Sequence, residues 1–385
     1  MLSKKMLCFA IIFVFLLSIH GSVQAECQNI ENLPAKSYIL VEANTGKVLA
    51  EKNADEKMPP ASITKIMTML LLAEKLDLGE VSLDDLVTTS EHANSMGGSQ
   101  VWLDVGEQMS IEDLLKATAI NSANDAAVAI SEHIAGSEEQ FVELMNQKAA
   151  ELGMTGSNFC NASGLDADGH LSTARDIAIM GRELIKYPLI IKYTSKYMDD
   201  LRNGKTELVN TNKMVRFYEG CNGLKTGTTD LAGSCLCATA TRNDMTLIAV
   251  SMGSETSKDR FDSCRSLLDY GFAGWELLSP NLDEMDAGYI EVVNGKKDSV
   301  ALRVDQAGPM LIPKNSSKKV EKKVELESSV EAPVQEGRCC GRVVYLLGDE
   351  EISSYDIVAD EGVGKVDFVF LLTSMINNFF NGTTV

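Results

Sequence analysis

The strongest constraint on the fold is a long helical region enclosed between two groups of strand-like segments. Residues 36–50 predict a hairpin made of two alternating runs. Helical patterns dominate from about residue 82 to 186, and three further strand-like runs lie between residues 223 and 253. A closing helix is predicted at 259–278. A sheet whose strands come from both ends of such a segment predicts an α/β fold with an antiparallel sheet.

A helical segment after the hairpin carries a serine and a lysine three residues apart. Residues 59–76 read PPASITKIMTMLLLAEKL, in which apolar residues recur at three- and four-residue steps. Ser62 is predicted as the N-cap, so Lys65 lies in the first turn, where a cation costs roughly 0.3–1 kcal/mol against the helix dipole. A helix N-terminus, burial and a second cation all lower the pKa of a lysine, which can then activate a serine hydroxyl as a base. The alternative is a plain N-cap serine beside a solvated lysine.

A second motif, Ser122-Ala123-Asn124, falls in the break between two predicted helices. In a cleft, Ser122 can relay a proton and Asn124 can orient Lys65 and a substrate amide. The alternative is that Asn124 or Asp125 caps the next helix.

A third motif, Lys225-Thr226-Gly227, lies on a predicted strand. Lys225 and Thr226 offer a cation and a hydroxyl to a carboxylate. Gly227 has no side chain, which lets a ligand backbone run along the strand edge. The alternative is a turn with a surface lysine.

The first residues and the charge limit where the protein works and what it binds. Residues 1–25 combine two lysines, a short apolar run and a small-residue cleavage site, which predicts a cleaved signal peptide and an exported protein. An uncleaved anchor is the alternative. The net charge of -20 argues against a nucleic acid partner, because phosphate binding needs a positive field.

Eight of the nine cysteines follow residue 25, yet their spacing does not indicate a compact disulfide framework. Cys235 and Cys237 alternate along a predicted strand and share one face, so they are not expected to bridge each other. Cys339 and Cys340 lie in a loop-like run. No pair of cysteines has a matching second pair at zinc-ligand spacing, so neither a metal nor another cofactor is expected.

The C-terminal third has a different pattern. Short alternating runs within residues 285–360 predict a small all-β domain, in which EKKVEL is a candidate exposed strand. Residues 363–385 form the last segment, and its apolar run 366–380 is shorter than the roughly 20 residues of a membrane-spanning helix. We expect this amphipathic segment to lie in the membrane interface, or alternatively to dock on the core.

Two of these motifs, S-x-x-K and K-T-G, are typical of β-lactamases and penicillin-binding proteins, and here the three motifs follow one another in this order. The chain resembles the low-molecular-mass penicillin-binding proteins that are serine-type D-alanyl-D-alanine carboxypeptidases. Residues 97–115 and 161–180 are also similar to that family. The resemblance implies a β-lactamase/transpeptidase-like domain over residues 26–280, followed by the small β domain and the C-terminal segment.

The resemblance also implies catalytic roles for residues of this chain. Ser62 attacks the carbonyl of the penultimate D-alanine of a peptidoglycan stem peptide, Lys65 accepts its proton, and Ser122 passes a proton to the leaving D-alanine. Penicillin is expected to acylate the same serine. Water then hydrolyses the acyl-enzyme.

Substrate binding is implied at the other side of the cleft. Lys225 and Thr226 hold the terminal carboxylate, and the backbone N–H groups of Ser62 and Thr228 form the oxyanion hole. Arg260 adds charge near Lys225. Some members of the family carry His where this chain has Thr228; the backbone donor survives that change.

Two other functions remain open from sequence. A β-lactamase shares the fold, but the second motif reads Ser-Ala-Asn rather than Ser-Asp-Asn, and Asn161 and Asp166 stand where a glutamate is expected to act as deacylation base. A non-catalytic penicillin-binding sensor of the same fold is the second alternative, although all three motifs are intact.

Overall fold

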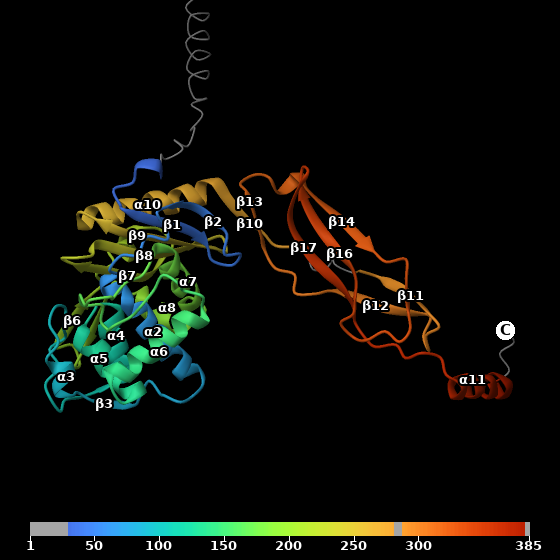
Figure 1. Ribbon diagram of the computed structural model, residues 1–385, viewed down its shortest axis with the longest axis horizontal. Coiled ribbons are helices and arrows are strands. Elements are labelled where there is room, and N and C mark those ends of the chain that lie inside the picture. Colours follow the sequence, from blue (N-terminus) through green and yellow to red (C-terminus); the bar gives the residue numbers. More distant parts are fainter. Residues whose placement is uncertain (1–29, 281–286, 382–385) are drawn as a thin grey trace, which may run out of the picture.

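The computed structural model describes residues 30–280 and 287–381. Its larger domain is built on a five-stranded antiparallel sheet in the order β2-β1-β9-β8-β7 (Figure 1). The strands are β1 (Ser37–Glu42), β2 (Val48–Lys52), β7 (Cys221–Thr229), β8 (Gly233–Arg242) and β9 (Met245–Ser254). The predicted antiparallel sheet with strands from both ends of the helical region is confirmed, and β7 forms one of its edges.

Both faces of the sheet are covered, as the side chains of β1 show. Ile39 and Val41 belong to the core beneath the helical region, whereas Tyr38 and Leu40 pack in the core under α10 (Ser257–Gly274). Figure 1 shows α10 on one face and the other helices on the opposite face. These are α2 (Lys65–Asp77), α4 (Ile111–Ala119), α5 (Asn124–Ala135), α6 (Glu138–Glu151), α7 (Ala174–Leu184) and α8 (Pro188–Thr194).

Short elements that the sequence did not predict surround this core. Two small hairpins pair β3 (Leu86–Thr88) with β4 (Gln108–Ser110) and β5 (Met198–Leu201) with β6 (Thr206–Val209). The one-turn helices α3 (Glu91–Asn94) and α9 (Met214–Phe217) lie beside them along the chain. Elements this short carry too few residues to show a periodic pattern.

The closing helix is shorter than predicted. A capping box between Thr256 and Asp259 starts α10, but the helix ends at Gly274, and the following residues form strand β10 (Trp275–Leu278). β10 pairs with β13 (Met310–Pro313) of the C-terminal region. Residues 275–278 are therefore apolar because they form a paired strand, and not because they continue the apolar face of the helix.

The C-terminal region is all-β, as predicted. Its six-stranded sheet has the order β14-β16-β17-β12-β11-β15 and surrounds a core that includes Val300, Val343 and Ile357. The strands are β11 (Tyr289–Val293), β12 (Ser299–Val304), β14 (Val320–Leu326), β15 (Ser329–Glu331), β16 (Cys339–Leu347) and β17 (Glu350–Ala359).

Two details of this region test the sequence analysis. EKKVEL falls in β14, whose side chains are mostly exposed, so the predicted exposed strand is confirmed. The prediction of a loop at Cys339 and Cys340 is wrong, because both begin β16, where Cys340 is buried in the domain core. The cysteines of the described residues are all free thiols, and Cys235 and Cys237 share one core as predicted.

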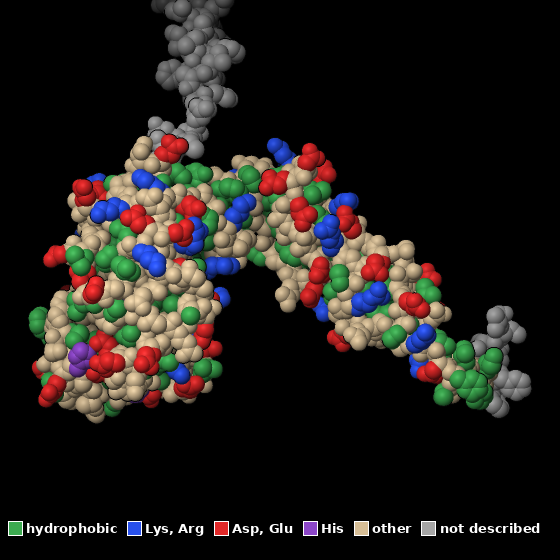
Figure 2. Space-filling view, in the orientation of Figure 1, with side chains coloured by type: hydrophobic (Ala, Val, Ile, Leu, Met, Phe, Trp, Pro, Cys, Tyr) green, Lys and Arg blue, Asp and Glu red, His purple; other side chains and the backbone are tan. Residues whose placement is uncertain are grey.

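The last element is helix α11 (Phe368–Asn381). Figure 1 places it at the end of the β domain that is remote from the catalytic sheet, and Figure 2 shows hydrophobic side chains gathered there. Among the described residues, no helix has the length and apolar character needed to cross a membrane. The predicted signal peptide, residues 1–25, lies outside the described residues.

Candidate active site

Ser62 lies on a tight turn that precedes α2. Residues Ala61–Thr64 form a 3₁₀ turn, and α2 begins at Lys65. The prediction that Ser62 is the N-cap of the helix is wrong: the N-cap position is Thr64, whose side chain caps no backbone group. In a 3₁₀ turn, side chains three residues apart eclipse, so the turn brings Ser62 and Lys65 to the same side.

The amine of Lys65 is buried among three oxygen atoms. Its Nζ lies 3.0 Å from Ser62 Oγ and donates hydrogen bonds of 2.6 Å to Asn124 Oδ1 and to the carbonyl oxygen of Ser163. Burial and the charge of Lys225 hold the pKa of Lys65 well below its usual value, and the Asp125 carboxylate opposes this effect. A neutral amine has two N–H groups, and the two carbonyl oxygens accept them. The lone pair of Lys65 then remains for the hydroxyl of Ser62.

The second motif lies between α4 and α5, and its Asn124 contacts Lys65. Ser122 is buried in the left-handed backbone region with φ of 64°, a conformation that costs free energy outside glycine and is frequent at functional sites. Asn124 is the first residue of α5, and Ala123 takes the N-cap position. The Asn124 side chain does not cap the helix, because it joins Lys65 to the carbonyl oxygen of Gly97, which accepts a 2.7 Å hydrogen bond from its Nδ2.

Lys225 of the third motif is also buried, which contradicts the alternative of a surface lysine. Its Nζ donates a 3.0 Å hydrogen bond to the carbonyl oxygen of Thr226. Burial and the charge of Arg260 lower the pKa of Lys225 to about 7. The hydroxyl of Thr226 donates to Thr211 Oγ1 at 2.7 Å, which places a second hydroxyl beside the third motif.

Gly227 has a close protein neighbour that the sequence did not predict. A Cβ at this position would lie 2.9 Å from Ala61 Cβ and 3.0 Å from the backbone N of Ser62. The close neighbour is the turn that carries Ser62, so edge strand β7 and this turn are packed as closely as a glycine permits. The prediction that a ligand backbone runs along this strand stays a prediction.

Arg260 supports β7 from α10. Its guanidinium donates 2.8 Å hydrogen bonds to the carbonyl oxygen of Gly227 and to Thr228 Oγ1. The predicted charge effect is present in the lowered pKa of Lys225. Its hydrogen bonds, however, position the strand segment that carries Thr228.

Sequence reasoning missed several groups of the site. The carbonyl oxygen of Ser163 and the hydroxyl of Thr211 come from loops whose position depends on the whole fold. Asp166, which stands where a β-lactamase is expected to carry its deacylation glutamate, accepts a 2.7 Å hydrogen bond from Thr229 Oγ1. No sequence pattern predicted these contacts, because each joins residues that are well separated in the chain.

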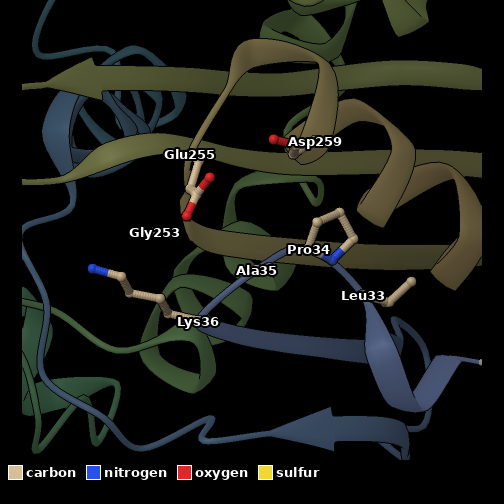
Figure 3. A pocket seen from close by; sticks show the side chains of 7 residues that line it. All are labelled: Leu33, Pro34, Ala35, Lys36, Gly253, Glu255 and Asp259. Atoms are coloured by element: carbon tan, nitrogen blue, oxygen red, sulfur yellow. The ribbon is translucent and has the colours of Figure 1, made fainter.

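A separate hollow of about 380 Å³ lies where β1 begins and β9 ends (Figure 3). The side chains of Lys36 and Glu255 border it, and Asp259 at its rim is engaged in the capping box of α10. None of the predicted site residues lines this hollow.

Comparison with known proteins decides the family. Residues 22–256 match the family described as D-alanyl-D-alanine carboxypeptidase, and residues 283–365 match the C-terminal domain of penicillin-binding protein 5. The chain belongs to the D-alanyl-D-alanine carboxypeptidase family. It is a serine-type carboxypeptidase of the low-molecular-mass penicillin-binding proteins, and the predicted resemblance, fold and enzyme class are confirmed.

Individual members of this carboxypeptidase family match most of the chain. D-alanyl-D-alanine carboxypeptidase DacF of Bacillus subtilis is 42% identical over 88% of both chains, and DacC of Escherichia coli is 35% identical over 92% of this chain and 91% of its own. The structure of penicillin binding protein 5 from Haemophilus influenzae aligns with a TM-score of 0.80 at 34% identity, covering 87% of this chain and 98% of that one. Penicillin-Binding Protein D2 from Listeria monocytogenes in its ampicillin-bound form aligns with a TM-score of 0.58 at 33% identity, covering 63% and 99%.

Proposed function

We propose that this carboxypeptidase removes the terminal D-alanine of a peptidoglycan stem peptide through an acyl-enzyme on Ser62. The observation that carries the proposal is the buried amine of Lys65, 3.0 Å from Ser62 Oγ, with its two N–H groups directed to carbonyl oxygens. An amine in this state accepts the hydroxyl proton as Ser62 Oγ attacks the carbonyl carbon of the penultimate D-alanine.

The remaining steps use groups on the same side of the cleft. As the tetrahedral intermediate collapses, the C–N bond breaks, and Ser122 passes the proton held by Lys65 to the leaving D-alanine amine. Asn124 keeps Lys65 in place through its 2.6 Å hydrogen bond. A water molecule then attacks the ester, giving the shortened peptide and the free serine.

The opposite side of the cleft binds the substrate. Lys225 and Thr226 hold the terminal carboxylate; the Thr226 hydroxyl, which donates to Thr211 Oγ1 in the free protein, turns its single proton to the carboxylate. The N–H groups of Ser62 and Thr228 form the oxyanion hole. The close approach of Gly227 to the Ser62 backbone supports this assignment, because a Cβ at Gly227 would lie only 3.0 Å from Ser62 N and Thr228 is the next residue of the strand.

The experiment that tests this function measures two products side by side. Purified protein is incubated with a peptide ending in D-alanyl-D-alanine and, separately, with a cephalosporin. The proposal predicts release of D-alanine, slow turnover of the drug, and loss of both activities in Ser62→Ala. Rapid drug hydrolysis without D-alanine release identifies a β-lactamase instead, and drug labelling without either turnover identifies a binding sensor.

We also propose where the protein works and how it is divided. Peptidoglycan lies outside the cytoplasmic membrane, which supports export by residues 1–25. The proposed units are the catalytic domain 26–280, the β domain 285–360 and the tail 363–385. We propose that α11 lies on the outer face of the cytoplasmic membrane. Exposed apolar side chains support this contact, among them Phe368 and Met375, with exposed fractions of 78% and 70%.

A further inference from the structure

His170 is a buried histidine that the proposed mechanism does not use. The backbone N–H of Cys160 donates a 2.9 Å hydrogen bond to its Nδ1. Nδ1 therefore carries no proton, and the neutral ring is protonated at Nε2. That nitrogen lies 2.8 Å from Thr64 Oγ1, so His170 donates to the hydroxyl of Thr64.

The ring stays neutral where the enzyme works. Burial lowers the pKa of His170 to about 4, and the Asp166 charge only partly opposes this effect. A second proton would have to sit on Nδ1, in the position that the N–H of Cys160 occupies. The tautomer and the orientation of the ring are thus fixed by its surroundings.

Thr64 belongs to the turn that decides the site geometry. It is the last residue of the 3₁₀ turn that carries Ser62, and it directly precedes Lys65. Its hydroxyl caps no backbone group of α2 and is instead hydrogen-bonded to His170.

The segment that contains His170 is joined to α2 at two further points. The carbonyl oxygen of Ser163 accepts from Lys65, and that of Ala162 accepts a 2.7 Å hydrogen bond from Thr68 Oγ1. Gly164 lies against the nucleophile turn, where a Cβ would be 2.0 Å from the carbonyl oxygen of Ala61. Residues 160–170 therefore pack against the 3₁₀ turn that carries Ser62 and help to fix its position.

We infer that His170 is a positioning residue that holds Thr64, and through it the 3₁₀ turn, at the geometry in which Lys65 reaches Ser62. The inference rests on the proposed function, because it assigns His170 a role in acylation of Ser62. A shift of the turn changes the distance between the amine and the hydroxyl, and a misplacement of about 1 Å can cost on the order of 100-fold in rate.

Two substitutions at His170 separate its two hydrogen bonds. The amide nitrogen of glutamine occupies the place of Nε2, so His170→Gln keeps the donor to Thr64 and loses the contact with Cys160. The shorter asparagine amide replaces Nδ1, so His170→Asn keeps the contact with Cys160 and loses Thr64. We expect His170→Asn to slow acylation by a fluorescent penicillin about tenfold or more, and His170→Gln to stay within about threefold of the parent rate.

Two further variants are needed: Thr64→Val as a second test of the same hydrogen bond, and Asn158→Ala as the control. Thr64→Val removes the same hydrogen bond from the other side, and the pair Thr64→Val with His170→Asn is expected to be no slower than the slower single variant. Asn158 Nδ2 donates a 2.9 Å hydrogen bond to the carbonyl oxygen of Gly169, which closes the same segment without contacting α2. Asn158→Ala should lower Tm and leave the acylation rate unchanged.

The pH profile of acylation is the readout that a merely structural role does not move. A displaced turn exposes Lys65 to solvent and so raises its pKa toward the ordinary value. The acid limb of the pH–rate profile should therefore shift to higher pH in His170→Asn and Thr64→Val but not in Asn158→Ala. Equal rates for His170→Asn and His170→Gln, or an equal loss in Asn158→Ala, overturn the inference while the proposed function stands. A parent protein that no penicillin acylates overturns the proposed function, and the inference falls with it.

Discussion

Lys65 and Lys225 are both buried, and no salt bridge joins either one to a carboxylate within residues 30–280 and 287–381. Their ammonium forms lose hydration without gaining an ion pair, so the folded protein favours the neutral amines. The two lysines also repel one another, which lowers the pKa of Lys65 further. The two buried lysines therefore reduce the stability of the fold at neutral pH.

This conflict predicts the effect of Lys225→Met. The folded pKa of Lys225 is about 7, below the value of about 10.4 in the unfolded chain, so between these values the unfolded state binds more protons and stability rises with pH. Removing the amine should raise the free energy of unfolding at pH 7 by on the order of a few kcal/mol and abolish turnover of the peptide.

Thermal unfolding at two pH values measures this effect. The gain in Tm should be larger at pH 7 than at pH 10, because pH 10 is close to the unfolded pKa of about 10.4 and the difference in bound protons then contributes little. Lys258→Met is a matched control, since the Lys258 side chain is exposed and should give no such gain. A Lys225→Met variant that is less stable than the parent at pH 7 contradicts the account.

At the scale of elements, the site depends on close packing between β7 and the 3₁₀ turn. Gly227→Ala introduces a Cβ at 3.0 Å from the carbonyl oxygen of Pro60 and from the backbone N of Ser62. Both neighbours are backbone atoms that cannot rotate away, so the turn must move off the strand. We expect acylation to slow by about 10- to 100-fold, measured as the rate of penicillin labelling.

A second glycine gives the control for this prediction. At Gly274 a Cβ meets nothing within 4 Å, so Gly274→Ala should leave the labelling rate unchanged. Equal rates for Gly227→Ala and the parent would show that the strand and the turn tolerate separation.

Local spacing explains what the sequence could predict of the site. Ser62 and Lys65 are three residues apart, so any helical turn brings them together, and Ser122 with Asn124 is marked by a break between two helical patterns. The Ser163 carbonyl lies 98 residues from Lys65 in the chain, and a backbone oxygen has no residue signature. The N-cap prediction for Ser62 failed because helix and 3₁₀ turn share the same local pattern at a helix start.

The same distinction applies to the elements. Alternating runs predicted many sheet strands of both domains, although not β13, β15 or β17, and the end of α10 was missed because β10 continues its apolar pattern. Only the pairing partner β13, beginning 32 residues after the end of β10, decides that these residues form a strand. Pairing between distant segments is a property of the fold rather than of the local sequence.

At the scale of the whole molecule, the β domain connects the catalytic domain to α11. β13 pairs with β10, and Lys314 Nζ donates a 2.9 Å hydrogen bond to the carbonyl oxygen of Phe272 in α10. At the other end, an ion pair of 2.6 Å joins Lys296 to Asp367, just before α11. The helix is thus attached to the tip of the β domain rather than to the catalytic core (Figure 1).

This arrangement predicts that membrane contact and catalysis are separable. Removal of residues 368–385 should release the protein from membranes and leave D-alanine release unchanged, because the cut keeps the ion pair of Asp367. Met375→Glu should weaken membrane binding by placing a charge among the apolar side chains. Fractionation of cells and flotation with lipid vesicles measure the effect.

Asn377→Glu is the matched control, since it adds the same charge at a polar position of α11. It should reduce membrane binding less than Met375→Glu does. A truncated protein that stays in the membrane fraction contradicts the proposed role of α11.

The pH dependence of Ser62 acylation tests most directly the claim that Lys65 is a neutral base. Penicillin labelling is timed from about pH 5 to 10 in the parent, in Lys65→Arg and in Ser62→Ala. The account predicts a parent rate that levels off well below the ordinary lysine pKa of about 10.4, and no labelling of either variant, since arginine keeps its proton. A parent rate that still rises tenfold per pH unit up to about pH 10, or rapid labelling of Lys65→Arg, contradicts it.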